Sequence, residues 1–232
     1  MITLRKAQER GHSSYSWLDS YHTFSFANYY DPQHMGFRNL RVINEDRVMG
    51  GAGFGTHAHR DMEIVSYVVE GALEHQDSMG NRSAIQAREV QRMSAGTGVA
   101  HSEYNHSATE GVRFLQIWIP PTHRGLEPSY EQRSFADAEK RGIFRLIVSP
   151  DGRDESLSID RDVYLYSTLL KAGETLKHEM SANRYGWLQI VNGEVTLNDI
   201  AMNGGDGAAT SDESQLELVA KQDTEVLLFD LA

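Results

Sequence analysis

The sequence predicts an all-β protein built from two antiparallel β-barrels of the jelly-roll type that pack together. Short apolar runs recur along the chain and are separated by Gly, Asn and Asp residues, which are typical of turns between strands. Helical periodicity is scarce, so these runs favour a barrel or sandwich. A chain of 232 residues can bury two small β domains, and we expect them at residues 1–125 and 126–232.

The N-terminal half begins with a strand or arm over residues 2–10, followed by an aromatic segment between Trp17 and Tyr30. This segment either packs against the first barrel or forms one wall of a pocket for an aromatic substrate, and the sequence leaves both open. The apolar runs that follow predict strands at residues 40–44, 62–70, 72–76, 90–93 and 113–119.

A polar, proline-containing stretch from Pro120 to about Glu139 is the expected linker, with a short helix or irregular crossover over residues 130–141. Beyond it we expect a second series of strands, at residues 144–148, 163–170, 187–191, 194–197, 216–219 and 226–231. The halves look weakly repeated, because residues 68–77 line up with residues 190–199. The second copy has a lone His178 with no partner two residues on, so we expect its barrel to bind no metal.

The composition restricts which partners, metal ligands and membrane segments are expected. The formal net charge of −11 argues against a nucleic-acid partner, since phosphate binding depends on Lys and Arg. No cysteine is present, so disulfides and thiolate ligands are excluded, and a metal would need His and carboxylate ligands. The N-terminus lacks a signal-peptide pattern, and no apolar run approaches the ~18 residues of a membrane span. We therefore expect a soluble cytoplasmic monomer with no membrane partner.

Two pairs of metal-binding residue types stand out, namely His57 with His59 and His101 with Glu103. Within each pair the residues are two positions apart, and in a β-strand such residues point to the same face. On two facing strands, three imidazoles and one carboxylate would meet at one point. The pattern predicts a mononuclear metal site with three nitrogen ligands and one oxygen ligand. His75 lies in polar surroundings and is expected at the surface.

The ligand set leaves the kind of site open. Four protein ligands in a six-coordinate sphere leave two positions, enough for a bidentate substrate or for substrate and dioxygen. A closed structural zinc site would use the same four side chains equally well. Imidazole and carboxylate suit Fe, Mn, Co, Ni, Cu and Zn alike. Gln116, inside an apolar run, is predicted either to bond a backbone group in the core or to contact a ligand.

The spacing of these residues resembles a known family. Gly51-x5-His57-x-His59-x3-Glu63 resembles the first cupin motif, and Gly98-x2-His101-x3-Asn105 resembles the second. The longer runs H-A-H-R-D-M-E-I-V-S-Y-V-V-E-G and M-S-A-G-T-G-V-A-H-S-E-Y-N are similar to those of pirins, as is the aromatic segment F-x-F-x-x-Y-x-D-P-x-x-x-G-F. The resemblance covers the chain through the linker and, more loosely, to its end. It looks closest to bacterial pirin-like proteins described as quercetin 2,3-dioxygenases.

The resemblance implies a bicupin with one divalent transition metal in its N-terminal barrel, and its ligands fall on His57, His59, His101 and Glu103. Iron is the first expectation for the metal, with Mn, Co, Ni, Cu and Zn as alternatives. Many cupins take their carboxylate ligand from the position of Glu63, whereas pirins use the glutamate two residues after the third histidine. Glu63 is expected behind the ligands, facing inward if the strand from residue 57 to 63 is unbroken.

The family's chemistry implies a dioxygenase that opens the central ring of a flavonol such as quercetin with dioxygen and releases carbon monoxide. The 3-hydroxyl and 4-keto oxygens would chelate the metal, and Glu103 would be the catalytic base that takes the 3-hydroxyl proton. An alternative is a regulatory protein, since eukaryotic pirins are regarded as nuclear cofactors of transcription factors that act through protein partners. A third is an isomerase or scavenger of another small ligand, because one barrel hosts many chemistries.

Overall fold

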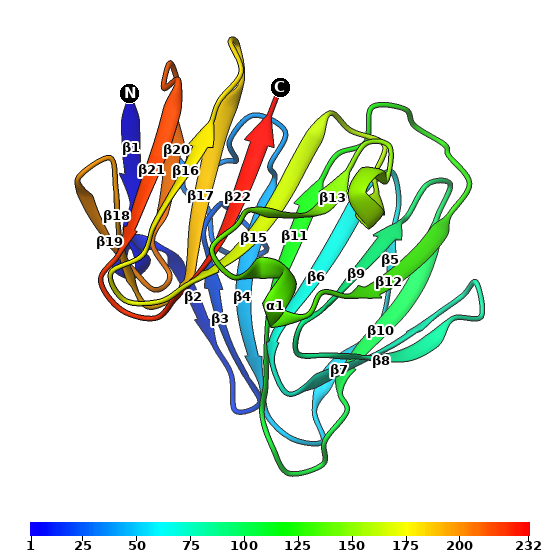
Figure 1. Cartoon of the computed structure of the whole chain (residues 1–232). Coiled ribbons are helices and arrows are strands. Elements are labelled where there is room, and N and C mark those ends of the chain that lie inside the picture. Colours follow the sequence, from blue (N-terminus) through cyan, green and yellow to red (C-terminus); the bar gives the residue numbers. More distant parts are fainter.

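The computed structural model describes the whole chain, residues 1–232, and it is almost entirely β-structure (Figure 1). Its strands form four sheets, two of seven strands and two of four. Neighbouring strands run antiparallel, except for the parallel pair β13 (Arg145–Ser149) and β14 (Leu157–Ser158). The predicted all-β class is confirmed. Each sheet is open and ends in two edge strands, so closure into jelly-roll barrels stays a prediction.

The N-terminal half packs a seven-stranded sheet against a four-stranded one. The larger sheet contains, in spatial order, β12 (Ser129–Ser134), β9 (Glu89–Ser94), β6 (Glu63–Glu70), β11 (Val112–Ile119), β4 (Val42–Val48), β3 (Leu18–His22) and β2 (Gly11–Ser14). The smaller sheet contains β5 (Gly53–His59), β10 (Val99–Asn105), β7 (Ala72–Asp77) and β8 (Arg82–Gln86). Every strand predicted in this half is present, with displaced ends.

The C-terminal half repeats this arrangement. Its larger sheet contains, in spatial order, β1 (Ile2–Arg5), β20 (Gly207–Thr210), β17 (Tyr185–Asn192), β22 (Thr224–Leu231), β15 (Val163–Leu170), β13 and β14. Its smaller sheet contains β16 (Thr175–Glu179), β21 (Gln215–Ala220), β18 (Glu194–Leu197) and β19 (Ile200–Asn203). The helices are short: α1 (Asp137–Lys140) and the 3-10 turns η1 (Ala7–Glu9) and η2 (Arg153–Glu155).

Two strands lie in the sheet of the opposite half. Strand β1, the first of the chain, pairs with β20 in the C-terminal sheet. Strand β12 lies within the stretch predicted as a linker, yet it pairs with β9 in the N-terminal sheet. Part of the expected linker, residues 129–134, is therefore an edge strand, and the division of the chain at residues 125 and 126 stays a prediction.

The largest apolar core lies between the two seven-stranded sheets and joins the halves. It contains 21 buried residues, among them Val65 and Tyr67 of β6 and Phe229 of β22. Side chains alternate along a strand, so Ile64 and Val68 of β6 point the other way, into the N-terminal half. The Tyr67 hydroxyl lies 2.9 Å from the hydroxyl of Ser167 and also bonds Glu225, so polar contacts cross the interface too.

The interiors of the two halves differ. A single group of 13 buried apolar residues fills the C-terminal half. The N-terminal half has two smaller groups, of seven and three residues, and polar side chains such as Asn44 and Gln116 occupy inward positions. In the C-terminal half His178 packs against Phe144 and Tyr166, with ring centroids 5.2 and 5.1 Å away. The expectation that this half binds no metal stays a prediction.

The aromatic segment near the N-terminus is divided between packing in the core and lining a cavity. Phe24 packs against Trp187 in the core between the halves, with ring centroids 4.9 Å apart. Trp17 and Phe26 instead line a cavity inside the N-terminal half.

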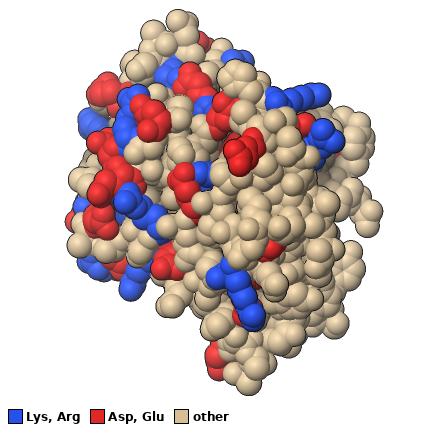
Figure 2. Space-filling model, turned by 90° about the vertical axis from the view of Figure 1, so that its right-hand side faces the viewer, with Lys and Arg blue, Asp and Glu red and all other residues tan.

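No helix of the structure has the length and apolar character needed to cross a membrane. Figure 2 shows the face formed by the strands at the right of Figure 1. On that face Lys and Arg lie among Asp and Glu toward one side, and much of the remaining area is uncharged.

Candidate metal centre

Strands β5 and β10 bring three of the predicted ligands together. The strands pair antiparallel with His101 directly opposite His57, and His59 follows two positions along β5. The three ring centroids lie 4.5 to 4.8 Å apart. One nitrogen of each ring lies within 4.8 Å of the others, close enough to share one ion. The same-face spacing thus predicted this arrangement of the histidines, whereas their binding of a metal stays a prediction.

Glu103 lies beside the histidines, and two strands of the opposite sheet hold its carboxylate. A register shift after His101 sets Glu103 opposite Phe54. The Gln116 amide donates to one carboxylate oxygen at 2.7 Å, and the Ser66 hydroxyl donates to the other at 3.3 Å. Gln116 is therefore a contact of the site, which answers the question that its sequence position left open.

Hydrogen bonding and burial leave histidine ring nitrogens unprotonated and able to bind a cation. His57 Nδ1 donates to the carbonyl of Gly55 at 2.9 Å, which leaves its Nε2 facing His101 Nε2 at 3.1 Å. His59 Nε2 is buried and has no hydrogen-bond partner. Burial, with His101 and His57 nearby, lowers the pKa of His59 to about 4, and burial with His57 and His75 nearby lowers that of His101 to about 3. Both rings are therefore neutral at neutral pH, the form that binds a metal.

The prediction that His75 lies at the surface is wrong. It is fully buried on β7, opposite Glu103, and its Nδ1 lies 3.5 Å from that of His101. His75 Nε2 donates to Asp77 at 2.9 Å, and its Nδ1 accepts from Gln91 at 2.9 Å. Because both ring nitrogens have partners, His75 supports the cluster from behind. The signal was present in the sequence, since His75 and Asp77 repeat the two-residue spacing of the ligand pairs.

Glu63 does not stand behind the ligands, so this expectation is wrong. Strand β5 ends at His59 and a turn follows, in which Asp61 has a φ of 48°, so the strand is broken. Glu63 begins β6 and shares the face of Tyr67, which points toward the other half. Its carboxylate accepts a hydrogen bond from Ser94 at 2.5 Å.

A cavity of about 450 Å³ opens onto His57, His59 and Glu103. Aromatic side chains form much of its wall, and Trp118 packs edge-on against His59 with centroids 4.9 Å apart. Phe26 packs edge-on against Trp118 at 5.3 Å. Aromatic and polar side chains share the lining of this cavity, which suits a flat aromatic ligand that carries polar substituents.

Comparison with known proteins identifies the family. The model of the Pirin family matches residues 3–119, and that of the quercetinase C-terminal cupin domain matches residues 146–231. This chain belongs to the pirin family. A quercetin 2,3-dioxygenase of Escherichia coli strain K12 is 53% identical over 231 residues, which cover 100% of this chain and 99% of that protein. A pirin-like protein of Caulobacter vibrioides is 39% identical, with 100% of each chain covered.

Solved pirin structures agree with this assignment. The crystal structure of the bacterial pirin YhhW from Escherichia coli, in complex with nickel(II), is 54% identical and superimposes with a TM-score of 0.95. The match covers 100% of this chain and 99% of that chain. The family predicted from the two motifs is therefore confirmed.

The residues present in this pirin fit a divalent transition metal. Two neutral imidazoles and a third one beside them have nitrogens facing one point, with a carboxylate next to them. A buried polar atom without a partner costs about 1–3 kcal/mol, and His59 Nε2 is such an atom. A bound cation would remove this cost.

Proposed function

We propose that this pirin is a metal-dependent dioxygenase that opens the central ring of flavonols such as quercetin. The observation that carries the proposal is the cluster of three histidines, with a buried and unpartnered Nε2 on His59, at the wall of a partly aromatic cavity of about 450 Å³. The activity named for the relative from Escherichia coli, at 53% identity over the full chain, supports the same conclusion.

The metal would be held by His57, His59, His101 and Glu103 as one divalent ion. Iron is the first expectation, and the nickel(II) complex of the related bacterial pirin supports a divalent ion of this series. When bound, the ion supplies a Lewis acid and a template for two neighbouring oxygens of the substrate.

The protein's own groups would position the flavonol and move its proton. Glu103 would accept the proton of the 3-hydroxyl group, since a carboxylate within reach of that oxygen can act as a general base. The hydrogen bonds from Gln116 and Ser66 hold this carboxylate in one orientation. Trp118 and Phe26 would flank the ring system and exclude water. Dioxygen and the flavonol together supply every atom of the cleaved depside and carbon monoxide, so no reductant is needed.

Replacement of the proposed base tests the mechanism. In metal-saturated Glu103→Gln, a side chain of the same shape keeps an oxygen donor but loses basicity. We expect flavonol binding to persist, seen as a shift of the ligand's absorption, while oxygen uptake falls by about 10²–10⁴-fold, the usual cost of losing a general base.

His101→Ala is the matched control, because it should lose metal and turnover together, as measured by elemental analysis and oxygen uptake. Full turnover in Glu103→Gln would remove the base role. If the wild type turns over no flavonol with Fe, Mn, Co, Ni or Cu, the alternative of a regulatory protein acting through protein partners is favoured.

A further inference from the structure

The cavity has a second polar wall, formed by strands β3 and β4 away from the histidines. The register sets Ser20 opposite Asp46 and His22 opposite Asn44, and all four side chains line the cavity. One strand further on, Gln116 lies opposite Asn44. A row of polar side chains therefore runs across the sheet from the Gln116 that holds Glu103.

Two groups of this wall lack protein partners and line the cavity. Asn44 is 2% exposed and Asp46 is 4% exposed. The Asn44 carbonyl oxygen accepts from His22 at 2.9 Å, and one carboxyl oxygen of Asp46 accepts from Ser20. The Asn44 amide nitrogen and the other carboxyl oxygen of Asp46 have no hydrogen-bond partner in the protein. Neither atom is among the fully buried atoms without a partner, so both are reachable from the cavity, where a water or a ligand can bond to them.

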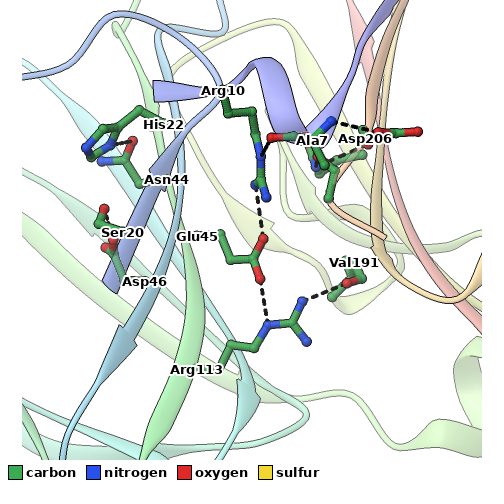
Figure 3. A network of polar contacts seen from close by, with 12 residues as sticks. Ala7, Arg10, Ser20, His22, Asn44, Glu45, Asp46, Arg113, Val191 and Asp206 are labelled. Atoms are coloured by element: carbon green, nitrogen blue, oxygen red, sulfur yellow. Dashed lines mark hydrogen bonds and ion pairs between the residues drawn. The ribbon is translucent and has the colours of Figure 1, made fainter. Parts of the chain in front are cut away.

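The wall is held rigidly from both sides. The Ser13 hydroxyl lies 2.9 Å from His22 Nε2 and holds the imidazole ring in place. The other ring nitrogen, Nδ1, donates to the carbonyl oxygen of Asn44, which leaves the Asn44 amide nitrogen free. Figure 3 shows Ser20 beside Asp46 and His22 beside Asn44, with the next residue of β4, Glu45, pointing away from them.

Glu45 anchors the strand on its other face. Its carboxylate is bound by Arg10 at 3.0 Å and by Arg113 at 2.9 Å (Figure 3). Arg113 also donates to the backbone carbonyl of Val191 in the other half at 2.7 Å. Strand β4 thus presents Asn44 and Asp46 to the cavity in a fixed geometry, as a recognition site requires.

The chemistry of the wall matches a neutral hydroxyl group. An amide nitrogen can only donate, whereas a carboxyl oxygen accepts, and a phenol hydroxyl offers both functions. Burial raises the pKa of Asp46 to about 7, and the negative charges of Glu103 and Glu45 add to this effect. An anionic ligand group would therefore be disfavoured here.

We propose that Asn44 and Asp46 form a subsite that binds a ring hydroxyl of the flavonol distant from its chelating 3-hydroxyl and 4-keto oxygens. This inference rests on the proposed function, and it makes the hydroxylation pattern of the substrate a determinant of specificity. If the flavonol carries no further ring hydroxyl, water would have to bond to the Asn44 amide nitrogen and to the free carboxyl oxygen of Asp46.

Two ligands that share the chelating oxygens separate this subsite from the metal centre. Quercetin carries further ring hydroxyls, whereas 3-hydroxyflavone carries none. We would measure their dissociation constants on metal-loaded protein without oxygen, from the absorption shift. Asn44→Ala and Asp46→Ala should each weaken quercetin by about 3- to 10-fold, the value of one hydrogen bond, and change 3-hydroxyflavone by less than about twofold. Asp46→Asn keeps a carbonyl oxygen that can accept from the ring hydroxyl while its amide nitrogen donates to Ser20, so it should bind quercetin like the wild type.

Arg47→Ala is the control, because Arg47 follows Asp46 on β4 but lies outside this cavity. Metal content and melting temperature verify each fold, and if Asp46→Ala does not fold, Asn44→Ala and Asp46→Asn carry the test. Equal weakening of both flavonols in the alanine variants would overturn the subsite and leave the proposed function intact. Failure of the wild type to bind either flavonol would overturn both.

Discussion

At the scale of single residues, Asp46 is a carboxylic acid whose surroundings oppose ionisation. Burial raises its pKa from 3.8 to about 7, against the opposing hydrogen bond from Ser20 and with the help of the negative charges on Glu103 and Glu45. In the unfolded chain the same carboxyl would titrate at its ordinary value. The folded protein therefore holds this proton more tightly than the unfolded chain does.

This difference predicts how stability depends on pH in the metal-free protein. Below pH 4 both states bind the proton, and between pH 4 and 7 only the folded state does. The wild type should therefore lose up to about 1.4 kcal/mol of unfolding free energy per pH unit across that window through Asp46. Asp46→Asn does not titrate, so its advantage over the wild type in urea unfolding should grow from pH 4 to 7 and then level off. Parallel pH profiles would contradict the assignment.

At the scale of elements, the metal centre depends on how closely β5 approaches β10. A Cβ added to Gly53 would lie 2.5 Å from the backbone oxygen of Glu103 and 2.5 Å from the Cα of Tyr104. Backbone atoms cannot move aside as a flexible side chain can. Gly53 is therefore required for the contact that places His57 beside His101.

Gly53→Ala should push β5 away from β10. We expect a loss of about 1–3 kcal/mol in unfolding free energy, as for other overpacked sites, and a fall in metal affinity of about 10-fold or more. Gly55→Ala is the matched control on the same strand, because its nearest atom, the Tyr104 hydroxyl, would lie 3.9 Å from the added Cβ. Isothermal titration with a divalent metal compares the two variants. Equal affinities would show that the separation of the strands does not limit the site.

The elements also show what sequence patterns can and cannot reveal. Strands with buried apolar residues, such as β6 and β15, were predictable from short apolar runs. The polar hairpin of β2 and β3 and the edge strand β12 were not, because pairing with a neighbouring strand, rather than their own composition, determines their structure. The same limit applies to the site. Spacing within one strand identified the two ligand pairs, but Asn44 joins the cavity only through pairing with strands distant in sequence.

At the scale of the whole molecule, the two halves have similar sheets and different interiors. Apolar residues fill the C-terminal half, where His178 is packed between aromatic rings. His178→Ala should therefore leave the metal content at one ion per chain in elemental analysis, whereas the same substitution at His101 should abolish it. A fall to half the wild-type content in His178→Ala would reveal a second site.

The shared core predicts that the halves unfold together. It contains 21 buried residues, most of them from the two larger sheets, and separating the halves would expose many of them. In urea, the fluorescence of Trp17 and Trp118 in a Trp187→Phe variant should change with the same midpoint as circular dichroism. In a second variant without Trp17 and Trp118, the fluorescence of Trp187 should likewise change with the same midpoint as the circular dichroism of that variant. Midpoints that differ within either variant would indicate independent units.

Strand β1 also has a consequence for synthesis of the chain on the ribosome. Its partner β20 lies about 200 residues later, since Ile2 pairs with Thr210. At about 5–20 residues per second, β1 therefore waits roughly 10–40 s after its synthesis for the strand that will pair with it. The strands of the N-terminal sheets, up to β12, are synthesised within that interval, but the pairing of β1 with the C-terminal sheet can form only after β20 has been made.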